Sequence, residues 1–354
     1  MTQNESVLVA MSGGVDSAAA AYLAAERGFG CAGLTLKLHS DYASCIKEAE
    51  ITAEKLGIPH YTADCRDAFL KEVIDRFVKT YIKGHTPNPC IYCNRFIKFA
   101  QLLKEARKLG YTRIATGHYA NTEYDAISGR WLLKKAADLK KDQSYVLYTL
   151  TQEYLKYIIF PLGSLTKQEV KEIAQRQNLV NAQKKESQDI CFIPDKNYAG
   201  FIEKYSGRTF PEGNFTDRSG NILGRHRGII RYTQGQKRGL GISLGRPMYV
   251  YEKNAADNTV VLCGGDELYT KSLFIRGINL IPFDSFSGRI KVNAKIRYNQ
   301  KEQPALAEQI NGDLIHIEFE KPQRAVTAGQ SAVLYDGDTV VGGGTIAEGR
   351  EWAE

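Results

Sequence analysis

The chain has 354 residues, a formal net charge of +7 at pH 7 and a hydrophobic content of 43%. A chain of this length exceeds one ordinary hydrophobic core, so we expect two or three domains. The modest excess of positive charge favours a polyanionic partner over an acidic one. No apolar run approaches the length that crosses a membrane, and the N-terminus lacks the apolar core of a signal peptide, so we expect no membrane partner.

Short apolar runs alternate with helical stretches from residue 5 to about residue 150. The predicted strands are 7–10, 32–38, 60–63 and 113–116. The predicted helices are 45–56, 69–81 and 96–109. This alternation predicts an α/β domain with a parallel sheet, helices on both faces, and ligands at the carboxyl ends of the strands. The segment 151–190 is also expected to be helical, with a break at residues 161–163.

The pattern changes from about residue 205, where glycine becomes frequent and short alternating runs predict strands. These runs are 248–251, 259–263, 291–298, 315–319 and 331–335. Recurring turn signals between them predict small β-domains or barrels. We therefore expect domains at residues 1–204, 205–272 and 273–354, with the stretch 281–288 close to a boundary between two β-modules.

A glycine loop near the N-terminus is the most informative motif. Residues 7–17 read VLVAMSGGVDS and are followed by the helical stretch AAAAYLAAERG. A strand, a glycine turn and a helix N-terminus in this order form an anion site, because unpaired N–H groups and the positive end of the helix dipole converge there. Ser12 and Ser17 add hydroxyl donors, whereas Asp16 suits a phosphate only when a cation such as Mg²⁺ bridges the two.

The lysine of a Walker A loop is missing from this motif. The loop instead resembles the SGGxDS pyrophosphate loop of the ATP pyrophosphatases, which split ATP between its α and β phosphates and adenylate a substrate. The resemblance implies an ATP pyrophosphatase (adenine nucleotide alpha hydrolase-like) domain with ATP and Mg²⁺ as cofactors. Two small β-rich domains would follow it, the last a β-barrel. The alternative is an ordinary glycine turn before a helix.

Seven cysteines, an odd number, predict a reducing, cytoplasmic location in which thiols serve chemistry or metal binding. Cys90 and Cys93 have C-x-x-C spacing within TPNPCIYCN (86–94), where two prolines hold the backbone extended. A helix start and basic neighbours are expected to lower the pKa of these thiols. Cys191 lies apart, between a predicted helix and a turn. Core positions are expected for Cys31, Cys65 and Cys263.

The cysteine pattern alone leaves three kinds of chemistry open. A C-x-x-C pair can be half of a zinc site, but a second close pair of ligands is missing from the sequence. Three cysteines can also hold an iron–sulfur cluster with one iron left open. In the third interpretation the cysteines transfer sulfur, one carrying a persulfide and another attacking it to release the sulfur.

The sequence resembles the tRNA-specific 2-thiouridylases (MnmA/TrmU family), which thiolate the wobble uridine of tRNA, over essentially the whole chain. The motifs that carry the resemblance are AMSGGVDS (10–17), TPNPCIYCNRFIKF (86–99), ATGHYA (115–120), LKKDQSYVLYTL (139–150), ESQDICFIP (186–194), RYTQGQKRGLGI (231–242), KIRYNQ (295–300) and GQSAVLYDGDTVVGGGTI (329–346). The resemblance implies adenylation of the uracil C2 oxygen with release of pyrophosphate.

The resemblance also implies a role for individual residues. Cys191 would receive a persulfide from a sulfur-donor protein, a cysteine desulfurase or a sulfur relay protein. Cys93 would attack it and leave a Cys93–Cys191 disulfide. ATP would be bound by Ala10, Met11, Ser12, Gly13, Gly14, Val15, Asp16, Ser17, Leu36 and Gly117. Contacts with tRNA would come from Asn88, Pro89, Cys90, His118, Lys141, Asp142, Gln143, Arg297, Tyr298 and Gln330.

Two positions depart from the family pattern. Cys90 stands where many members have Asp, so the site would hold three thiols, and Cys90, Cys93 and Cys191 become possible ligands of a [4Fe–4S] cluster. The persulfide route and a cluster-dependent route therefore both stay open. Leu36 stands where Met is common, which changes the expected adenine pocket little because the two side chains are similar in volume.

A basic stretch distinguishes the central part of the chain. Residues 218–251 contain no Asp or Glu but include Arg218, Arg225, Arg227, Arg231, Lys237, Arg238 and Arg246. This predicts a platform for RNA phosphates with Tyr232 available for stacking, and a solvated basic face is the alternative. His118 follows Gly117 at a predicted strand end and is expected to face the site rather than to be a buried structural histidine.

Two other functions compete with tRNA thiolation. An amide-forming ligase of the ATP pyrophosphatase type would share the loop but has no need of paired thiols or of the basic β-region. A non-catalytic RNA-binding or metal-binding protein would use the cysteines for zinc.

Overall fold

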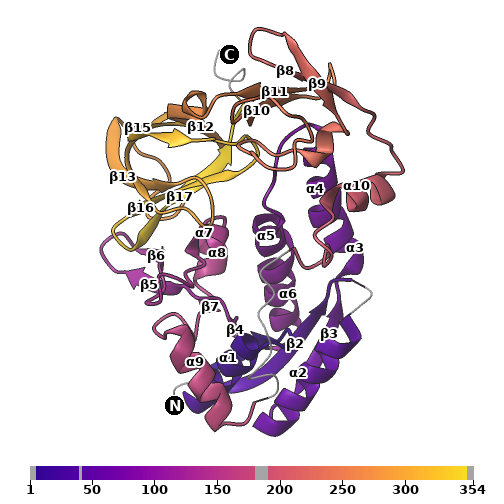
Figure 1. Cartoon of the computed structure of the whole chain (residues 1–354). Coiled ribbons are helices and arrows are strands. Elements are labelled where there is room, and N and C mark those ends of the chain that lie inside the picture. Colours follow the sequence, from indigo (N-terminus) through magenta and orange to yellow (C-terminus); the bar gives the residue numbers. More distant parts are fainter. Residues whose placement is uncertain (1–4, 40–41, 180–189, 349–354) are drawn as a thin grey trace.

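A five-stranded parallel sheet organises the first part of the chain, with strand order β3-β2-β1-β4-β7 (Figure 1). The computed structural model describes residues 5–39, 42–179 and 190–348. The strands of this sheet are β1 (Ser6–Ala10), β2 (Gly30–Lys37), β3 (His60–Asp64), β4 (Arg113–Ala115) and β7 (Ile158–Ile159). The predicted parallel sheet is confirmed.

Helices cover both faces of this sheet because successive side chains of β1 point to opposite sides. Val7 and Val9 enter an apolar cluster with α1 (Val15–Glu26) and α2 (Ala43–Leu56), whereas Leu8 belongs to the cluster formed with α6 (Phe99–Leu109). The predicted helix 45–56 is confirmed and starts two residues earlier, at Ala43.

Two long helical stretches each contain a π-helical turn. The first runs through α3 (Arg66–Phe69), η2 (Leu70–Ile74) and α4 (Asp75–Ile82). The second runs through α5 (Pro89–Tyr92), η3 (Cys93–Lys98) and α6. The predicted helices 69–81 and 96–109 lie within these stretches. Because π-helical turns are frequent at functional sites, the start of η3 at Cys93 makes this position a candidate for function.

The segment after residue 150 is only partly helical, which corrects the expectation for residues 151–190. It contains α8 (Gln152–Leu155) and α9 (Lys167–Arg176), and α7 (Ser144–Leu147) precedes it. Ile158 and Ile159 form β7, which pairs with β4 at the edge of the sheet. The pattern of a short apolar run does not distinguish strand from helix, and parallel pairing with β4 decides its conformation here. Residues 180–189 lie outside the described part of the chain.

A small β-domain follows α10 (Tyr198–Ser206). Its four strands have the order β10-β11-β8-β9. They are β8 (Gly213–Thr216), β9 (Ile222–His226), β10 (Tyr249–Asn254) and β11 (Thr259–Cys263), with a 3-10 turn at η4 (Ile229–Arg231). The expected β-rich character of this region is confirmed.

The last part of the chain closes into a barrel, as predicted. Strands follow one another in the order β12-β15-β14-β13-β16-β17, and β12 also pairs with β17. They are β12 (Tyr269–Leu280), β13 (Arg289–Lys295), β14 (Gln303–Asn311), β15 (Leu314–Arg324), β16 (Ser331–Asp336) and β17 (Thr339–Ile346), with η5 (Asp266–Leu268) before them. Figure 1 shows this barrel and the smaller β-domain together at the end of the molecule away from the parallel sheet.

Two features of the barrel differ from the sequence-based expectations. The hairpin β5 (Asn121–Asp125) and β6 (Arg130–Lys134) leaves the first domain and joins the barrel sheet through pairing of Lys134 with Thr339. The stretch 281–288 links β12 to β13 within the barrel sheet, so it is not a boundary between modules. The predicted start of the last domain at residue 273 falls inside β12, and we propose that this domain begins with β12.

No helix of the described residues is long and apolar enough to cross a membrane.

Candidate active site

The loop between β1 and α1 has the form that an anion site requires. Gly13 has φ +73°, and a Cβ at this position would lie 2.7 Å from the carbonyl oxygen of Cys45, so only glycine fits without a shift. Ser17 Oγ donates to the carbonyl of Gly14 at 2.8 Å and accepts from the Ser12 N–H at 3.2 Å. Gly14 occupies the N-cap and has no side chain to cap the helix, so an anion can use the first N–H groups of α1.

This loop lies at the point where the strand order of the sheet reverses. The chain runs from β1 to β2 on one side, while β4 pairs with β1 on the other. In open parallel sheets, ligands bind in the crevice at such a switch point. Gly117 follows β4, and a Cβ there would lie 2.8 Å from the carbonyl carbon of Asp16. The structure thus brings Gly117 against the loop, as the predicted ATP site requires.

The remaining residue predicted for ATP binding, Leu36, lies near the same edge of the sheet. In β2, Leu34 pairs with Ala10 at the end of β1, and Leu36 pairs with Ala63 of β3. Leu36 is buried. Its position beyond the last β1 pair is compatible with the adenine role, which stays a prediction.

Asp16 has partners that were not predicted from the sequence. Lys167 Nζ lies 2.7 Å and 2.9 Å from the two carboxylate oxygens of Asp16, and the Tyr119 hydroxyl donates to Oδ1 at 2.8 Å. Lys167 is only 7% exposed. An ammonium group of α9 therefore neutralises the Asp16 carboxylate in this structure.

One sequence signal could have identified Lys167. Thr166 and Glu169 form a capping box, so Lys167 is the first residue of α9. A cation at a helix N-terminus opposes the helix dipole, and acidic residues are preferred there. A lysine directly after an evident N-cap is thus a candidate for a role outside its own helix.

The C-x-x-C loop forms the start of the second long helical stretch. Asn88 is the N-cap of α5, and its Oδ1 accepts the N–H of Cys90 at 3.1 Å, while Pro89 occupies the first helical position. Cys90 is exposed at this end, and Cys93, one turn further, is 6% exposed. Cys191, on the segment before α10, is exposed.

The three thiols influence one another electrostatically, so they lie in one region. Burial raises the pKa of Cys93 to about 12, opposed by the Lys98 ammonium and reinforced by the thiols of Cys191 and Cys90. Desolvation also raises the pKa of Cys90 and of Cys191. The expected lowering of these pKa values is wrong, because loss of water around a thiolate outweighs the helix terminus and the Lys98 charge.

The first turn of α2 connects the thiols with the glycine loop. The carbonyl of Cys45 approaches Gly13 closely, as the clash of a Cβ there shows. Tyr42, next to α2, has a pKa raised by burial and further by the thiols of Cys191 and Cys93. One end of α2 is therefore close to both the predicted phosphate site and the two predicted catalytic cysteines. Cys31, Cys65 and Cys263 are buried, as expected.

Comparison with known proteins shows the family of the chain. A family model described as tRNA methyl transferase HUP domain matches residues 5–195, a tRNA methyl transferase PRC-barrel domain matches 199–264, and an aminomethyltransferase beta-barrel domain matches 270–346. The tRNA-specific 2-thiouridylase MnmA of Clostridioides difficile is 45% identical over 98% of this chain and 99% of its own length. The chain belongs to the MnmA family.

Two further relatives show the same full-length match. MnmA 1 of Caldanaerobacter subterraneus subsp. tengcongensis is 47% identical over 98% of this chain and 99% of its own length. MnmA of Acetivibrio thermocellus is 46% identical over 96% of this chain and 98% of its own length. The resemblance drawn from the sequence motifs is confirmed, and so is the fold class.

The residues that the MnmA resemblance assigns to tRNA contact fall into two groups in the structure. Some side chains are already engaged within the protein. His118 is buried and stacks on Phe99, and burial lowers its pKa well below the usual value, with Lys98 adding to the effect. Asp142 is buried and accepts from Ser144 Oγ at 2.6 Å. These positions favour structural roles, contrary to the expectation that His118 faces the site.

The second group reaches the surface or joins the barrel to the cysteine loop. Tyr298 is exposed, and Lys141 and Gln143 are partly exposed. Gln143 Oε1 accepts the N–H of Tyr119 at 3.0 Å. Arg297 donates to the carbonyls of Arg324 and Ala325, and Gln330 donates to the carbonyl of Thr86. Contacts of these residues with tRNA stay predictions, and for Gln330 the bond to Thr86 supports a competing role in positioning the cysteine loop.

The basic stretch of the central domain is partly neutralised. Arg218 pairs with Glu267 at 3.1 Å and Arg231 with Glu203 at 3.0 Å, using acids outside residues 218–251. Tyr232 is 2% exposed and packs on Phe215, so the expected stacking of RNA on this ring is wrong. Its aromatic character serves the core of the small β-domain.

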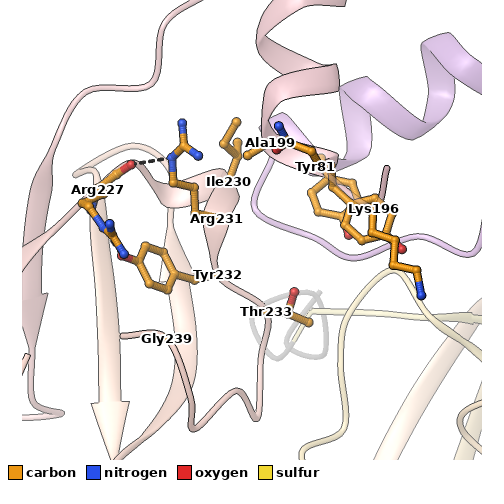
Figure 2. A pocket seen from close by; sticks show the side chains of 11 residues that line it. Tyr81, Lys196, Ala199, Arg227, Ile230, Arg231, Tyr232, Thr233 and Gly239 are labelled. Atoms are coloured by element: carbon orange, nitrogen blue, oxygen red, sulfur yellow. Dashed lines mark hydrogen bonds between the residues drawn. The ribbon is translucent and has the colours of Figure 1, made fainter. Parts of the chain in front are cut away.

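A cavity of about 290 Å³ lies where this domain meets α4 and α10. Figure 2 shows Tyr81 and Lys196 on one side and Arg227 and Arg231 on the other, with the Arg231 Nε donating to the Arg227 carbonyl at 2.8 Å. The basic lining is consistent with a polyanionic partner, which the positive net charge also favours.

Proposed function

We propose that the chain catalyses ATP-dependent 2-thiolation of the wobble uridine of tRNA. Membership of the MnmA family supports this function. The observation that carries it is that two chemical groups meet at the start of α2. The glycine loop lies against Cys45 through Gly13, and the thiols of Cys93 and Cys191 act on Tyr42. Activation by ATP and sulfur delivery need these groups close together.

The glycine loop serves the first step, in which the uracil C2 oxygen attacks the α-phosphorus of ATP and pyrophosphate leaves. The N–H groups at the start of α1 bind phosphate oxygens, and Ser12 can donate from its hydroxyl. Mg²⁺ would neutralise the phosphates when bound. Asp16 is the carboxylate that would hold it, since such sites need only one or two carboxylates besides the phosphates. The product carries AMP, a good leaving group, at uracil C2.

The two cysteines serve the second step. Cys93 attacks the inner sulfur of a deprotonated Cys191 persulfide and gives its proton to the outer sulfur, so that a Cys93–Cys191 disulfide forms and the outer sulfur leaves as hydrosulfide. Hydrosulfide then adds to the activated C2 carbon, AMP leaves with its electron pair, and loss of a proton gives 2-thiouridine. An external dithiol must reduce the disulfide before the next turnover.

The exposure of the two thiols suits these separate roles. Cys191 is exposed and accessible to a sulfur-donor protein, a cysteine desulfurase or a relay protein, whereas Cys93 is buried against the helical core. All seven cysteines are free thiols in the structure, which fits a reducing compartment such as the cytoplasm.

The arrangement of the described residues does not fit an iron–sulfur cluster or a zinc ion. Within the described ranges, no group of three His, Cys, Asp or Glu side chains is placed to hold a metal ion. The proposed sulfur transfer therefore uses no cluster on Cys90, Cys93 and Cys191. The alternative predicted from the sequence is tested by iron and sulfide analysis of anaerobically purified, active protein.

The function is tested by measuring pyrophosphate release and 2-thiouridine in the same reaction. We expect both to require tRNA, ATP and a persulfide source. The Cys93→Ser and Cys191→Ser variants should form no 2-thiouridine. An amide-forming ligase would instead release pyrophosphate with a small acid or nucleotide and without RNA. Parent-level thiolation by either serine variant would overturn the proposal.

A further inference from the structure

Tyr42 stands at the start of α2, where the glycine loop and the thiols come together. It is the N-cap residue of this helix, and its half-buried ring packs against the apolar cluster that contains Cys93. The ring also meets His39 edge-on, with the two ring centres 4.7 Å apart. Three residues further along the chain, the carbonyl of Cys45 approaches Gly13. Packing therefore fixes the tyrosine ring next to both parts of the candidate active site.

The hydroxyl of Tyr42 lies close to the thiols. Burial raises the pKa of this hydroxyl, and the thiols of Cys191, Cys93 and Cys45 raise it further. A charged sulfur has such an effect only at short range, because the interaction weakens with distance. The phenol therefore keeps its proton at physiological pH and is a hydrogen-bond donor beside the two predicted catalytic cysteines.

Packing does not explain why this side chain carries a hydroxyl. Among the residues that the structure describes, the Tyr42 hydroxyl has no hydrogen-bond partner. A phenylalanine would fill the same apolar space, and removal of a hydroxyl from water without a hydrogen bond costs free energy. The hydroxyl is therefore available to a group that arrives with the substrates.

Sulfur transfer brings such a group to this place. In the deprotonated persulfide the outer sulfur carries the negative charge, and it leaves as hydrosulfide when Cys93 bonds to the inner sulfur. A negative charge in a site with little water needs a cation or hydrogen-bond donors around it. Burial raises the pKa of Cys93 and of Cys191, and the Lys98 ammonium opposes this effect at both thiols. Lys98 therefore supplies the cation, and Tyr42 supplies a hydrogen-bond donor.

We propose that Tyr42 is a catalytic residue of sulfur transfer, whose hydroxyl donates a hydrogen bond to the outer sulfur of the Cys191 persulfide. The inference rests on the proposed function for the identity of the sulfur carrier. The hydrogen bond is kept while the outer sulfur takes the proton of Cys93 and leaves as hydrosulfide, and Tyr42 keeps its own proton throughout. Because the start of α2 also lies against the glycine loop, the released sulfur is retained next to the activated uracil.

The test follows one labelled persulfide sulfur on Cys191 in a single turnover with ATP and tRNA. Disulfide formation, free hydrosulfide, 2-thiouridine and pyrophosphate are each measured. We expect Tyr42→Phe, which keeps the ring and removes only the hydroxyl, to accept the label and to release pyrophosphate as the parent does. Its Cys93–Cys191 disulfide should form about tenfold more slowly, the effect of one lost hydrogen bond to a charged group. A larger share of the label should escape to the solution as hydrosulfide.

Tyr154→Phe is the matched control, because Tyr154 is also half-buried and packs against the same apolar cluster. It lies on α8 and should form the disulfide at the parent rate. Disulfide formation at the parent rate in Tyr42→Phe would overturn the proposal. An equal slowing of pyrophosphate release would also overturn it, because such a result shows a general change of the site. A parent that forms the disulfide and hydrosulfide without 2-thiouridine would refute the proposed function alone, whereas a parent that forms no disulfide would refute both.

Discussion

The side-chain amide of Gln330 donates a hydrogen bond of 2.6 Å to the carbonyl of Thr86, and this bond joins the barrel to the loop that leads to Cys90. The backbone supports the same contact, since the N–H of Thr86 donates to the carbonyl of Ala328 at 3.3 Å. The sequence resemblance assigned Gln330 to tRNA. In the structure its amide positions the loop that presents the C-x-x-C thiols.

We expect Gln330→Ala to lower kcat for tRNA thiolation several-fold while the Kd for tRNA stays within about twofold. Loss of one hydrogen bond should reduce the free energy of unfolding by about 1 kcal/mol. Steady-state kinetics and filter binding measure the two quantities. A large rise in Kd with unchanged kcat would show instead that Gln330 contacts tRNA directly.

The raised pKa of Cys93 makes the stability of the fold depend on pH. The pKa of Cys93 is about 12 in the folded chain, against an ordinary value of 9.0. Between these two pH values the folded chain keeps the thiol proton that the unfolded chain has lost. The stabilisation is complete below about pH 9 and is lost as the pH rises towards 12. At pH 10 the ionisation of this thiol in the unfolded chain should lower the free energy of unfolding by about 1 kcal/mol.

Urea unfolding at pH 8 and pH 10 measures this effect. The Cys93→Ala variant has a lower free energy of unfolding throughout, because a buried side chain is removed, but its decrease between the two pH values should be smaller than that of the parent. Equal decreases would show that Cys93 titrates normally in the folded chain.

The contact between Gly117 and Asp16 should make position 117 intolerant of any side chain. In Gly117→Ala the new Cβ would lie 2.8 Å from backbone atoms of Asp16, so the glycine loop must shift. We expect ATP affinity to fall at least tenfold, since the N–H groups of the shifted loop no longer point towards the same phosphate. Gly312→Ala, where a Cβ meets open space, is the matched control and should bind ATP as the parent does. Parent-like ATP binding by Gly117→Ala would place the nucleotide elsewhere.

Two tyrosines of the β-domains differ in exposure, and only the exposed one is a candidate for RNA contact. Tyr232 is buried and its hydroxyl accepts the N–H of Arg227 at 3.2 Å, whereas Tyr298 is 36% exposed. We expect Tyr232→Phe to cost about 1 kcal/mol of stability without changing tRNA affinity. Tyr298→Ala should weaken tRNA binding by about 1–3 kcal/mol, the range for a base stacked on an aromatic ring. Thermal unfolding and tRNA binding measured on both variants test this, and weaker tRNA binding by Tyr232→Phe would contradict it.

Local patterns in the sequence were sufficient for the elements that form the predicted ATP site. The run before Ser12 predicted β1, and the glycines predicted the turn onto α1, because each depends on neighbouring residues. Alternating runs also predicted small β-domains or barrels, whereas closure of the last sheet depends on pairing of β12 with β17. Hairpin β5–β6 was missed because its place is decided by pairing of Lys134 with Thr339, far away along the chain.

The environment of individual side chains was harder to predict. The lower pKa expected for Cys93 followed from its basic neighbours, and only the packed structure shows that burial dominates. The basic neighbours of Tyr232 predict a place on the RNA surface, but its ring is buried against Phe215. The ion pair of Lys167 depends on Asp16, which is distant in the sequence, so no local pattern predicts it.

We propose above all that sulfur passes to tRNA from Cys191, and that Cys93 attacks the Cys191 persulfide. It is tested most directly by loading the chain with one labelled persulfide sulfur and adding ATP and tRNA in a single turnover without iron. We predict that the parent transfers the label to uridine and forms the Cys93–Cys191 disulfide. Cys93→Ser should keep the label on Cys191, and Cys191→Ser should not be loaded. Label transfer by Cys93→Ser at the parent rate, or transfer that appears only after iron is restored, would contradict the account.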